Sequence, residues 1–345
     1  MADGLELPPD VSADDAEIHR SGSGRPFVRT PDECFDDLVD FPWEPNYVEV
    51  DGMRMHYVEA GDPAGEVVLL LHGQPDWSYL YRKMIPVLAD AGMRVIAPDH
   101  FGFGRSDKPV QLGDYRYLRH VAWITEFMDA LDLRDITPVV QDWGSLIGMR
   151  CVGDDPDRFA RLVVANGQLP VLPEGFAPFP MPDSLEPRDL EFPFIAGEGG
   201  GMARFGEWIS YALVSTSFMP SVVMGASIRV PISEAELAAY DAPYPSRIHM
   251  AGPRTFPSLV NTVGDAPTNE GPRAALDAFP RPVLGMFGLQ DPLFANDDTM
   301  NATRVQIAGA AGQPHKDYPD AGHFIQEDVG AELATDIVDW MRATR

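Results

Sequence analysis

The stretch that decides the fold is VVQDWGS, residues 139–145. An apolar run meets an acidic residue here, and Gly144 follows two positions later, before a helical pattern begins. A sharp turn from strand to helix needs little side-chain bulk at that second position. Such a turn lifts one side chain above the sheet edge and aims a helix N-terminus at it, where the helix dipole favours negative charge. The pattern predicts Asp142 as a nucleophile at the end of a strand. The alternative interpretation is a helix N-cap, a common position for Asp.

Apolar runs of strand length lie on both sides of this turn. They occupy residues 47–50, 54–60, 67–71, 94–97, 136–140, 162–165 and 282–287, and helical patterns occupy residues 80–91, 117–131, 145–152 and 329–341. Asp51 and Gly52, between the first two runs, are typical of a β-hairpin turn. Near-continuous apolar strands that alternate with helices favour a sheet covered on both faces. The order predicts an α/β fold with a mostly parallel central sheet flanked by helices.

The chain changes character near residue 170. Residues 170–200 are rich in Pro, Gly and acidic residues and carry no clear strand, and residues 202–260 form helical patterns broken by prolines. Residues 1–25 are polar and acidic without periodicity, which is typical of a mobile tail. We therefore predict a mobile N-terminal tail over 1–28, a core made of 29–170 and 261–345, and an inserted helical cap over 171–260.

The composition limits the classes of partner. The 345 residues are 45% hydrophobic and 23% charged, the profile of a globular protein. No apolar run approaches the roughly 18–20 residues that span a bilayer, and the N-terminus does not resemble a secretory signal. For these reasons we expect a cytoplasmic protein. A net charge of −27 disfavours nucleic acids and anionic membranes, so we expect neither as a partner. The acidity fits either adaptation to high salt or a bias of genome composition. Two cysteines, Cys34 and Cys151, cannot make a disulfide framework or a four-cysteine metal site.

Three further segments supply groups that a nucleophilic Asp142 requires. In HGQPDW, residues 72–77, a strand ends at a His-Gly turn, and the backbone N–H of Gln74 can face the nucleophile. Together with the N–H of Trp143 it would form a two-donor oxyanion hole. Asp291 follows a late strand, and His323 lies in a short Gly-containing loop before the last helix. The order nucleophile, acid, histidine is that of α/β-hydrolases.

At this point the sequence resembles the haloalkane dehalogenases, and most closely the subgroup typified by the 1,2-dichloroethane-degrading enzyme. The resemblance covers residues 29–345 and includes RTPD at 29–32, WSYLYRKM at 77–84, PDHFGFGRSDKP at 98–109, the elbow around Asp142 and the AGHF loop at 321–324. It implies an α/β-hydrolase fold with an inserted helical cap. It also implies Asp142 as nucleophile, His323 as base and Asp291 as the partner of His323.

Position 166 favours one subgroup of this family. Some family members carry the acid of the histidine after the strand that follows the nucleophile helix, where this chain has Asn166. An amide cannot balance the charge of an imidazolium, so Asp291 takes that role. The same difference implies that two tryptophans bind halide. Trp143 would be one, and Trp208, in a segment similar to the Phe-x-x-Trp segment of the family, would be the other; the alternative for Trp208 is a buried core aromatic. Phe205 would form an apolar wall of the substrate pocket.

We therefore expect hydrolytic dehalogenation through an alkyl-aspartate ester, with a haloalkane, water and a halide ion as partners and no metal or organic cofactor. We expect a monomer or a weak homo-oligomer. An epoxide hydrolase is the nearest alternative, since it shares the Asp elbow and needs two cap tyrosines to protonate the epoxide. Tyr211, Tyr240 and Tyr244 are available for that. A non-catalytic receptor on the same fold is the second alternative, although the retained triad argues against it.

Overall fold

The computed structural model describes residues 6–169, 177–194, 201–263 and 270–345. Its centre is an eight-stranded sheet in the order β11-β10-β9-β8-β5-β6-β4-β3, parallel from β11 to β6 and antiparallel at β4 and β3. The strands are β3 (Asn46–Val50), β4 (Met53–Gly61), β5 (Val67–Leu71), β6 (Arg94–Pro98), β8 (Thr137–Val140), β9 (Leu162–Ala165), β10 (Val283–Gly288) and β11 (Lys316–Tyr318). The predicted α/β fold, its mostly parallel sheet and its hairpin at Asp51 are confirmed.

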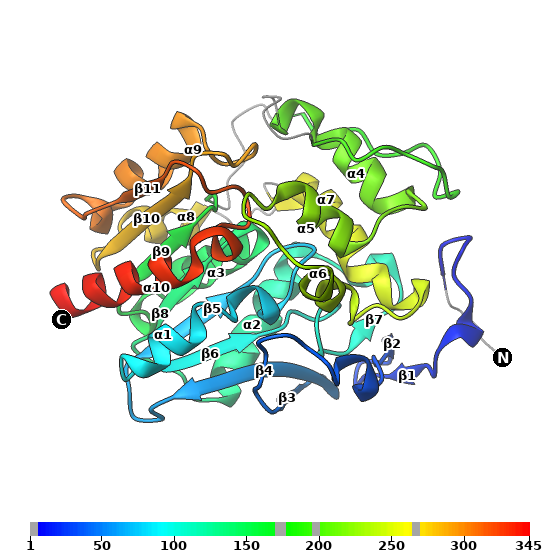
Figure 1. The fold of residues 1–345 in the computed structure, drawn as a ribbon, viewed down its shortest axis with the longest axis horizontal. Helices are drawn as coiled ribbons and strands as arrows, with labels where there is room; N and C mark the ends of the chain where they lie inside the picture. Colours follow the sequence, from blue (N-terminus) through cyan, green and yellow to red (C-terminus); the bar gives the residue numbers. More distant parts are fainter. Residues whose placement is uncertain (1–5, 170–176, 195–200, 264–269) are drawn as a thin grey trace.

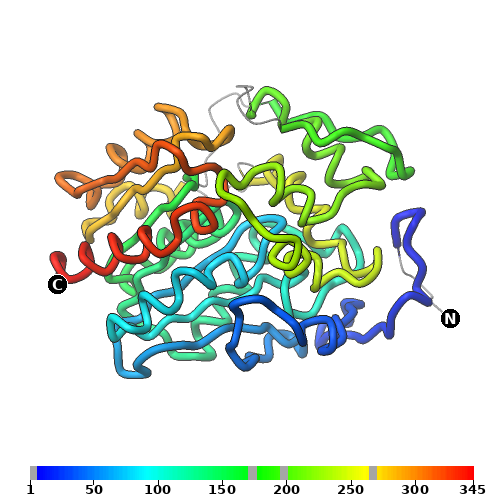
Figure 2. Tube along the Cα trace, viewed as in Figure 1, coloured from blue at the N-terminus to red at the C-terminus, as the bar shows by residue number. Residues whose placement is uncertain are grey.

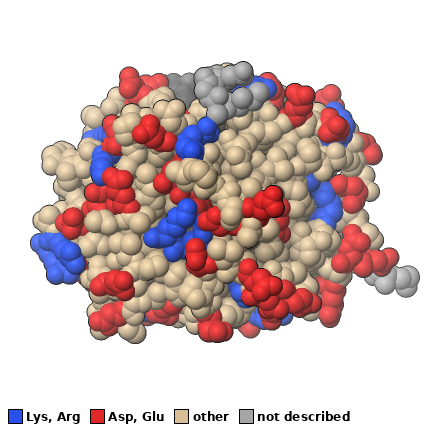
Figure 3. Space-filling view, in the orientation of Figure 1, with Lys and Arg blue, Asp and Glu red and all other residues tan. Residues whose placement is uncertain are grey.

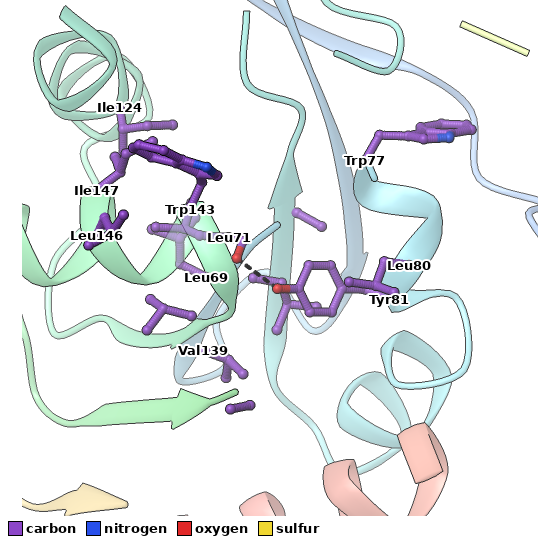
Figure 4. Packing of buried hydrophobic residues seen from close by; sticks show 14 of the residues in the cluster. Leu69, Leu71, Trp77, Leu80, Tyr81, Ile124, Val139, Trp143, Leu146 and Ile147 are labelled. Atoms are coloured by element: carbon purple, nitrogen blue, oxygen red, sulfur yellow. Dashed lines mark hydrogen bonds between the residues drawn. The ribbon is translucent and has the colours of Figure 1, made fainter. Parts of the chain in front are cut away.

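Helices cover both faces of this sheet (Figure 1). On one face α1 (Ile85–Asp90) packs against α10 (Ile325–Ala343), and on the other α3 (Asp142–Asp154) packs against α2 (Tyr117–Ala130) and α8 (Glu270–Asp277). The inner strands are buried over their length because both faces are covered. Figure 4 shows part of this core, where Trp143, Leu146 and Ile147 of α3 lie beside Ile124, and the Tyr81 hydroxyl donates to the Leu71 carbonyl at 2.8 Å.

A group of helices lies over the carboxyl edge of the parallel strands (Figure 1). It consists of α4 (Phe205–Val214), α5 (Pro220–Ser227), α6 (Glu234–Asp241) and α7 (Ala251–Val263). α6 begins with a capping box between Ser233 and Glu236, and α5 begins with Pro220 at a first-turn position where a missing N–H costs nothing. The insertion is therefore a helical cap, as expected. Ligands of open α/β sheets bind at this edge, so the cap covers the place where a site is expected.

The prediction of a mobile tail over residues 1–28 is wrong for much of that segment. β1 (His19–Arg20) pairs with β2 (Pro26–Val28), which pairs in turn with β7 (Lys108–Pro109) of the core. Phe27 and Val28 are buried, and Asp10 forms an ion pair with Arg247 beside the cap. The signal for these strands is weak because only short apolar pieces interrupt the polar residues of this segment. Residues 1–5 lie outside the described part.

The first described residues and the end of α10 lie at opposite ends of the long axis (Figure 2). On the face drawn in Figure 3, acidic side chains are spread over the surface and basic ones lie mostly beside them, as the net charge predicts. Within the described ranges, no helix is both long enough and apolar enough to cross a membrane.

Candidate active site

The turn between β8 and α3 presents Asp142. Its φ of 46° is a left-handed value that non-glycine residues adopt rarely and often at functional sites. A Cβ on Gly144 would lie 2.0 Å from the Leu71 carbonyl oxygen, so this close approach of α3 to β5 requires glycine. The Asp142 carboxylate accepts hydrogen bonds from the backbone N–H groups of Gln74, at 2.9 Å to Oδ1, and Trp143. The N-cap of α3 is Gln141, so the alternative role of Asp142 as a helix cap is wrong.

His323 lies between Asp291 and Asp142, the predicted partner acid and the predicted nucleophile. Its Nδ1 is 3.0 Å from Asp291 Oδ2, and its Nε2 is 3.7 Å from Asp142 Oδ2. Asp291 is held in turn, because its Oδ1 accepts from the N–H groups of Leu293 at 2.8 Å and Phe294 at 3.3 Å. The structure therefore brings all three predicted residues together in the order acid, imidazole, nucleophile.

Burial and charge act in opposite directions on these groups. Burial lowers the pKa of His323, but the neighbouring Asp291 carboxylate, with a contribution from Asp142, outweighs it and raises that pKa to about 9. Burial raises the pKa of Asp142, although His323 and the two backbone N–H groups favour its charged form. At neutral pH the resting site thus favours a protonated His323.

The loop after β5 supplies the second backbone donor to Asp142. A Cβ on Gly73 would lie 2.4 Å from Asp142 Oδ1, so only glycine lets the loop come this close. His72 braces the loop: its Nδ1 is 2.8 Å from the Gly73 carbonyl, and its Nε2 accepts from the His100 N–H at 2.9 Å. The Gln74 side chain donates to the Pro253 carbonyl of α7 at 2.6 Å, which ties the loop to the cap.

A cavity of about 40 Å³ lies between this edge of the sheet and the cap. Asp142, His323 and Gln74 form one side of it, and Phe205, Phe192 and Phe194 are among its apolar walls. A cavity of this size holds a small molecule or a few waters, since one water needs about 10–15 Å³ on the same measure. Phe205 thus lies where the sequence predicted a pocket wall.

Trp143 and Trp208 line the same cavity from opposite elements, α3 and the cap helix α4. Neither indole N–H has a hydrogen-bond acceptor among the described residues, and neither nitrogen is among the buried polar atoms without a partner. An indole N–H is a donor only, so two such groups beside one apolar cavity suit an anion that accepts hydrogen bonds. Trp208 is also buried among aromatic rings, so the packing role and the binding role coexist.

The cap tyrosines do not reach the cavity as the described residues outline it. The Tyr240 hydroxyl donates to Glu327, and the Tyr211 hydroxyl donates to the Ser217 carbonyl at 3.3 Å. The Tyr244 hydroxyl is buried without a protein partner and lies outside the cavity lining. The pair of acidic donors that epoxide opening needs is therefore not directed at Asp142.

Two polar residues of the site were not assigned a role from the sequence. Asn166 donates to the carbonyls of Gly322 at 2.6 Å and His323 at 3.0 Å and accepts from the Gly288 N–H at 2.7 Å, so it joins the histidine loop to β10. Asp76 is fully buried, and burial together with the charge of Asp142 raises its pKa to about 8. The buried position of Asp76, in a loop beside the nucleophile, leaves it a neutral acid at pH 7.

The chain resembles characterised families over most of its length. Residues 66–194 match the family model described as the alpha/beta hydrolase fold. A relative named haloalkane dehalogenase 1, from Mycobacterium tuberculosis, is 45% identical over 92% of this chain and 99% of its own. A haloalkane dehalogenase from Mycobacterium marinum is 43% identical over 91% and 99%. The solved structure of the tetrameric haloalkane dehalogenase DpaA from Paraglaciecola agarilytica superposes with a TM-score of 0.72 at 32% identity, over 90% of this chain and 97% of that one. A Vigna radiata epoxide hydrolase mutant, at 21% identity and a TM-score of 0.67, shares the fold.

Proposed function

The chain belongs to the haloalkane dehalogenase family, and we propose that it hydrolyses haloalkanes through an ester formed on Asp142. The observation that carries this assignment is a buried carboxylate together with two indole N–H groups, which have no acceptor among the described residues, around one small cavity with aromatic walls. A carboxylate is already anionic and needs no base to activate it. Since no described residue accepts from either indole N–H, both groups are available to donate to a halide.

In the first step Asp142 attacks the halogen-bearing carbon from behind. Its Oδ1 accepts from the Gln74 N–H, which leaves Oδ2, the oxygen 3.7 Å from His323 Nε2, as the attacking atom. The carbon–oxygen bond forms as the carbon–halogen bond breaks, and the halide takes the electron pair. The indole N–H groups of Trp143 and Trp208 stabilise the charge that develops on the halogen, and they act strongly because the cavity is apolar.

In the second step water cleaves the ester. His323 takes a proton from the water at Nε2, and the resulting hydroxide attacks the carboxyl carbon of Asp142. The Gln74 and Trp143 N–H groups stabilise the oxyanion, since both already donate to the Asp142 carboxylate. Asp291 holds the proton of Nδ1 and balances the imidazolium charge. The bond between the carboxyl carbon and the alkoxy oxygen then breaks, and the alkoxide takes the proton held by His323 and leaves as the alcohol. The carboxylic acid formed on Asp142 loses its proton to solvent, which restores the carboxylate.

The test follows the covalent intermediate. Wild-type protein should release halide from 1-chlorobutane and 1-bromobutane in steady turnover. His323→Phe should release about one halide per site and then stop, with the mass of the protein increased by one butyl group. His19→Phe, on β1 and outside the cavity, is the matched control and should turn over normally. Normal alcohol release by His323→Phe, or an absence of halide release by wild type, would refute the assignment.

The same assay separates the nearest alternative. Styrene oxide should be turned over far more slowly than the haloalkanes, because none of the three cap tyrosines lines the described cavity. Turnover of styrene oxide above that of 1-bromobutane would instead favour an epoxide hydrolase. The domain boundaries at residues 170 and 260, a cytoplasmic location and a monomeric or weakly associating state stay predictions.

A further inference from the structure

The catalytic loop, residues 319–324, carries His323 and leads directly into the first turn of α10, which contacts the cap. Val329, with φ −137° and ψ 28°, interrupts the helical backbone and separates residues 325–328 from the remainder of α10. The position of this short turn is therefore set by its own contacts and not by the long helix behind it. Two acidic residues in the turn, Glu327 and Asp328, supply those contacts.

Asp328 joins two backbone segments with one carboxylate. Its Oδ1 accepts from the N–H of Arg229 at 2.7 Å and from that of Val230 at 3.2 Å, both in the connection between α5 and α6 of the cap. Its Oδ2 accepts from the N–H of Gly322 at 2.7 Å, the residue before His323. In Figure 1 this connection passes beside the start of α10. Hydrogen bonds to an ionised acceptor are the stronger kind, so the carboxylate is a firm link between cap and catalytic loop.

Neighbouring contacts connect the same two parts. A Cβ on Gly322 would lie 2.6 Å from the carbonyl oxygen of Ser227, at the end of α5, so the cap backbone rests directly on the catalytic loop. The Glu327 carboxylate accepts a hydrogen bond from the Tyr240 hydroxyl of α6 and forms an ion pair with the buried Arg82 of the core. Arg82 also pairs with Glu236 of α6 at 2.7 Å.

We propose that Asp328 is a positioning residue that holds His323 in register with the docked cap, so that the base is correctly placed only while the cap is seated. The proposal rests on the proposed function, in which His323 acts in ester hydrolysis alone. Attack by Asp142 needs no base, so a small displacement of the histidine loop should leave that step nearly unchanged. It should slow the attack of water, which depends on the position of Nε2 relative to the ester.

The test compares the two chemical steps in Asp328→Asn and Asp328→Ala. Asn keeps the size of the side chain but turns an NH2 group toward either the two cap N–H groups or the Gly322 N–H, and Ala removes all three hydrogen bonds. Asp336→Asn is the matched control, since Asp336 lies on the same helix and accepts from Lys316 at 2.6 Å and Tyr318 at 2.7 Å, away from the loop and the cap. Rapid-quench halide release gives the rate of the first step, and mass spectrometry gives the decay of the butyl-enzyme.

We expect hydrolysis to be slowed roughly 10-fold in Asp328→Asn and up to about 100-fold in Asp328→Ala, as for a displaced catalytic group. Carbon–halogen cleavage should stay within about twofold of wild type, and Asp336→Asn should change neither step. A structural role alone would reduce the amount of folded enzyme without changing the ratio of the two rates. An unchanged ratio in both Asp328 variants therefore overturns the proposal. If wild type releases no halide at all from these substrates, the proposed function fails and this inference fails with it.

Discussion

Trp208→Phe should slow carbon–halogen cleavage selectively. Trp208 is surrounded by the rings of Phe192, Phe194, Tyr211 and Phe218 at centroid distances of 5.7–5.9 Å. A phenyl ring fits such an aromatic environment, so the substitution chiefly removes the indole N–H from the cavity. The folded state should therefore survive with a modest loss of stability.

The expected loss in the rate of carbon–halogen cleavage follows from the hydrogen bond that the indole N–H would donate to the leaving halide. Deleting one preorganised donor to a developing anion costs about 3 kcal/mol of transition-state stabilisation, which is roughly 10²–10³-fold in rate. Trp143 keeps its own N–H, so the loss should not be complete. Chloride accepts hydrogen bonds more strongly than iodide, so the loss should be largest for chloroalkanes and smallest for iodoalkanes.

The assay is pre-steady-state halide release from matched 1-chloro-, 1-bromo- and 1-iodobutane. Trp340→Phe is the control, because its indole donates to Gln313 at 2.9 Å on a part of α10 remote from the cavity. A rate of cleavage within about threefold of wild type for 1-chlorobutane would show that Trp208 does not bind the leaving halide. An equal loss for all three halogens would point to a disturbed pocket and not to a lost donor.

Three other predictions follow from the same site. Asp291→Asn should slow ester hydrolysis by up to about 10⁴-fold, since the amide neither fixes the imidazole tautomer nor balances its charge, and butyl-enzyme should accumulate in the mass spectrum. The single-turnover rate of ester hydrolysis should rise with pH as His323 loses its proton, with a midpoint below the pKa of about 9 in the resting enzyme; a midpoint at or above 9 would contradict this. Asp76→Asn should stabilise the fold in urea titrations, increasingly between about pH 4 and pH 8, because the unfolded carboxyl loses its proton near 3.8 while the buried one keeps it to about 8; a gain that does not change with pH would contradict this.

The central strands could be predicted because each is a buried apolar run in a sheet covered on both faces. β5 and β9 have the predicted bounds, and β10 is shifted by one residue. β11 was missed, since it is a three-residue edge strand with two polar residues. The helix predicted at 80–91 is divided into a turn at Ser78–Tyr81 and α1, because Pro86 has no N–H for the preceding turn and restricts the residue before it.

The meeting of Asp142, Asp291 and His323 could be predicted because each follows a strand and has a distinctive local sequence. The residues that hold these groups in place could not be predicted, since their hydrogen-bond partners are backbone groups far away in the chain. Asn166 donates hydrogen bonds to the carbonyls of residues 322 and 323, and Asp328 accepts hydrogen bonds from the N–H groups of residues 229 and 230. No local pattern predicts such pairs, and the fold must be known before they can be seen. The same is true of Asp76, whose neutrality depends on burial that the loop sequence does not reveal.

The raised pKa of His323 fits a base that the first chemical step makes available. A histidine with a pKa of about 9 is protonated at neutral pH and cannot accept a proton from water. The Asp142 carboxylate is one of the charges that raise this pKa, and esterification removes that charge. The pKa must therefore fall once the alkyl-enzyme forms, while burial continues to favour the neutral imidazole. In the proposed mechanism His323 therefore gives up its proton more readily once the ester has formed, and it regains the proton when the carboxylate is restored.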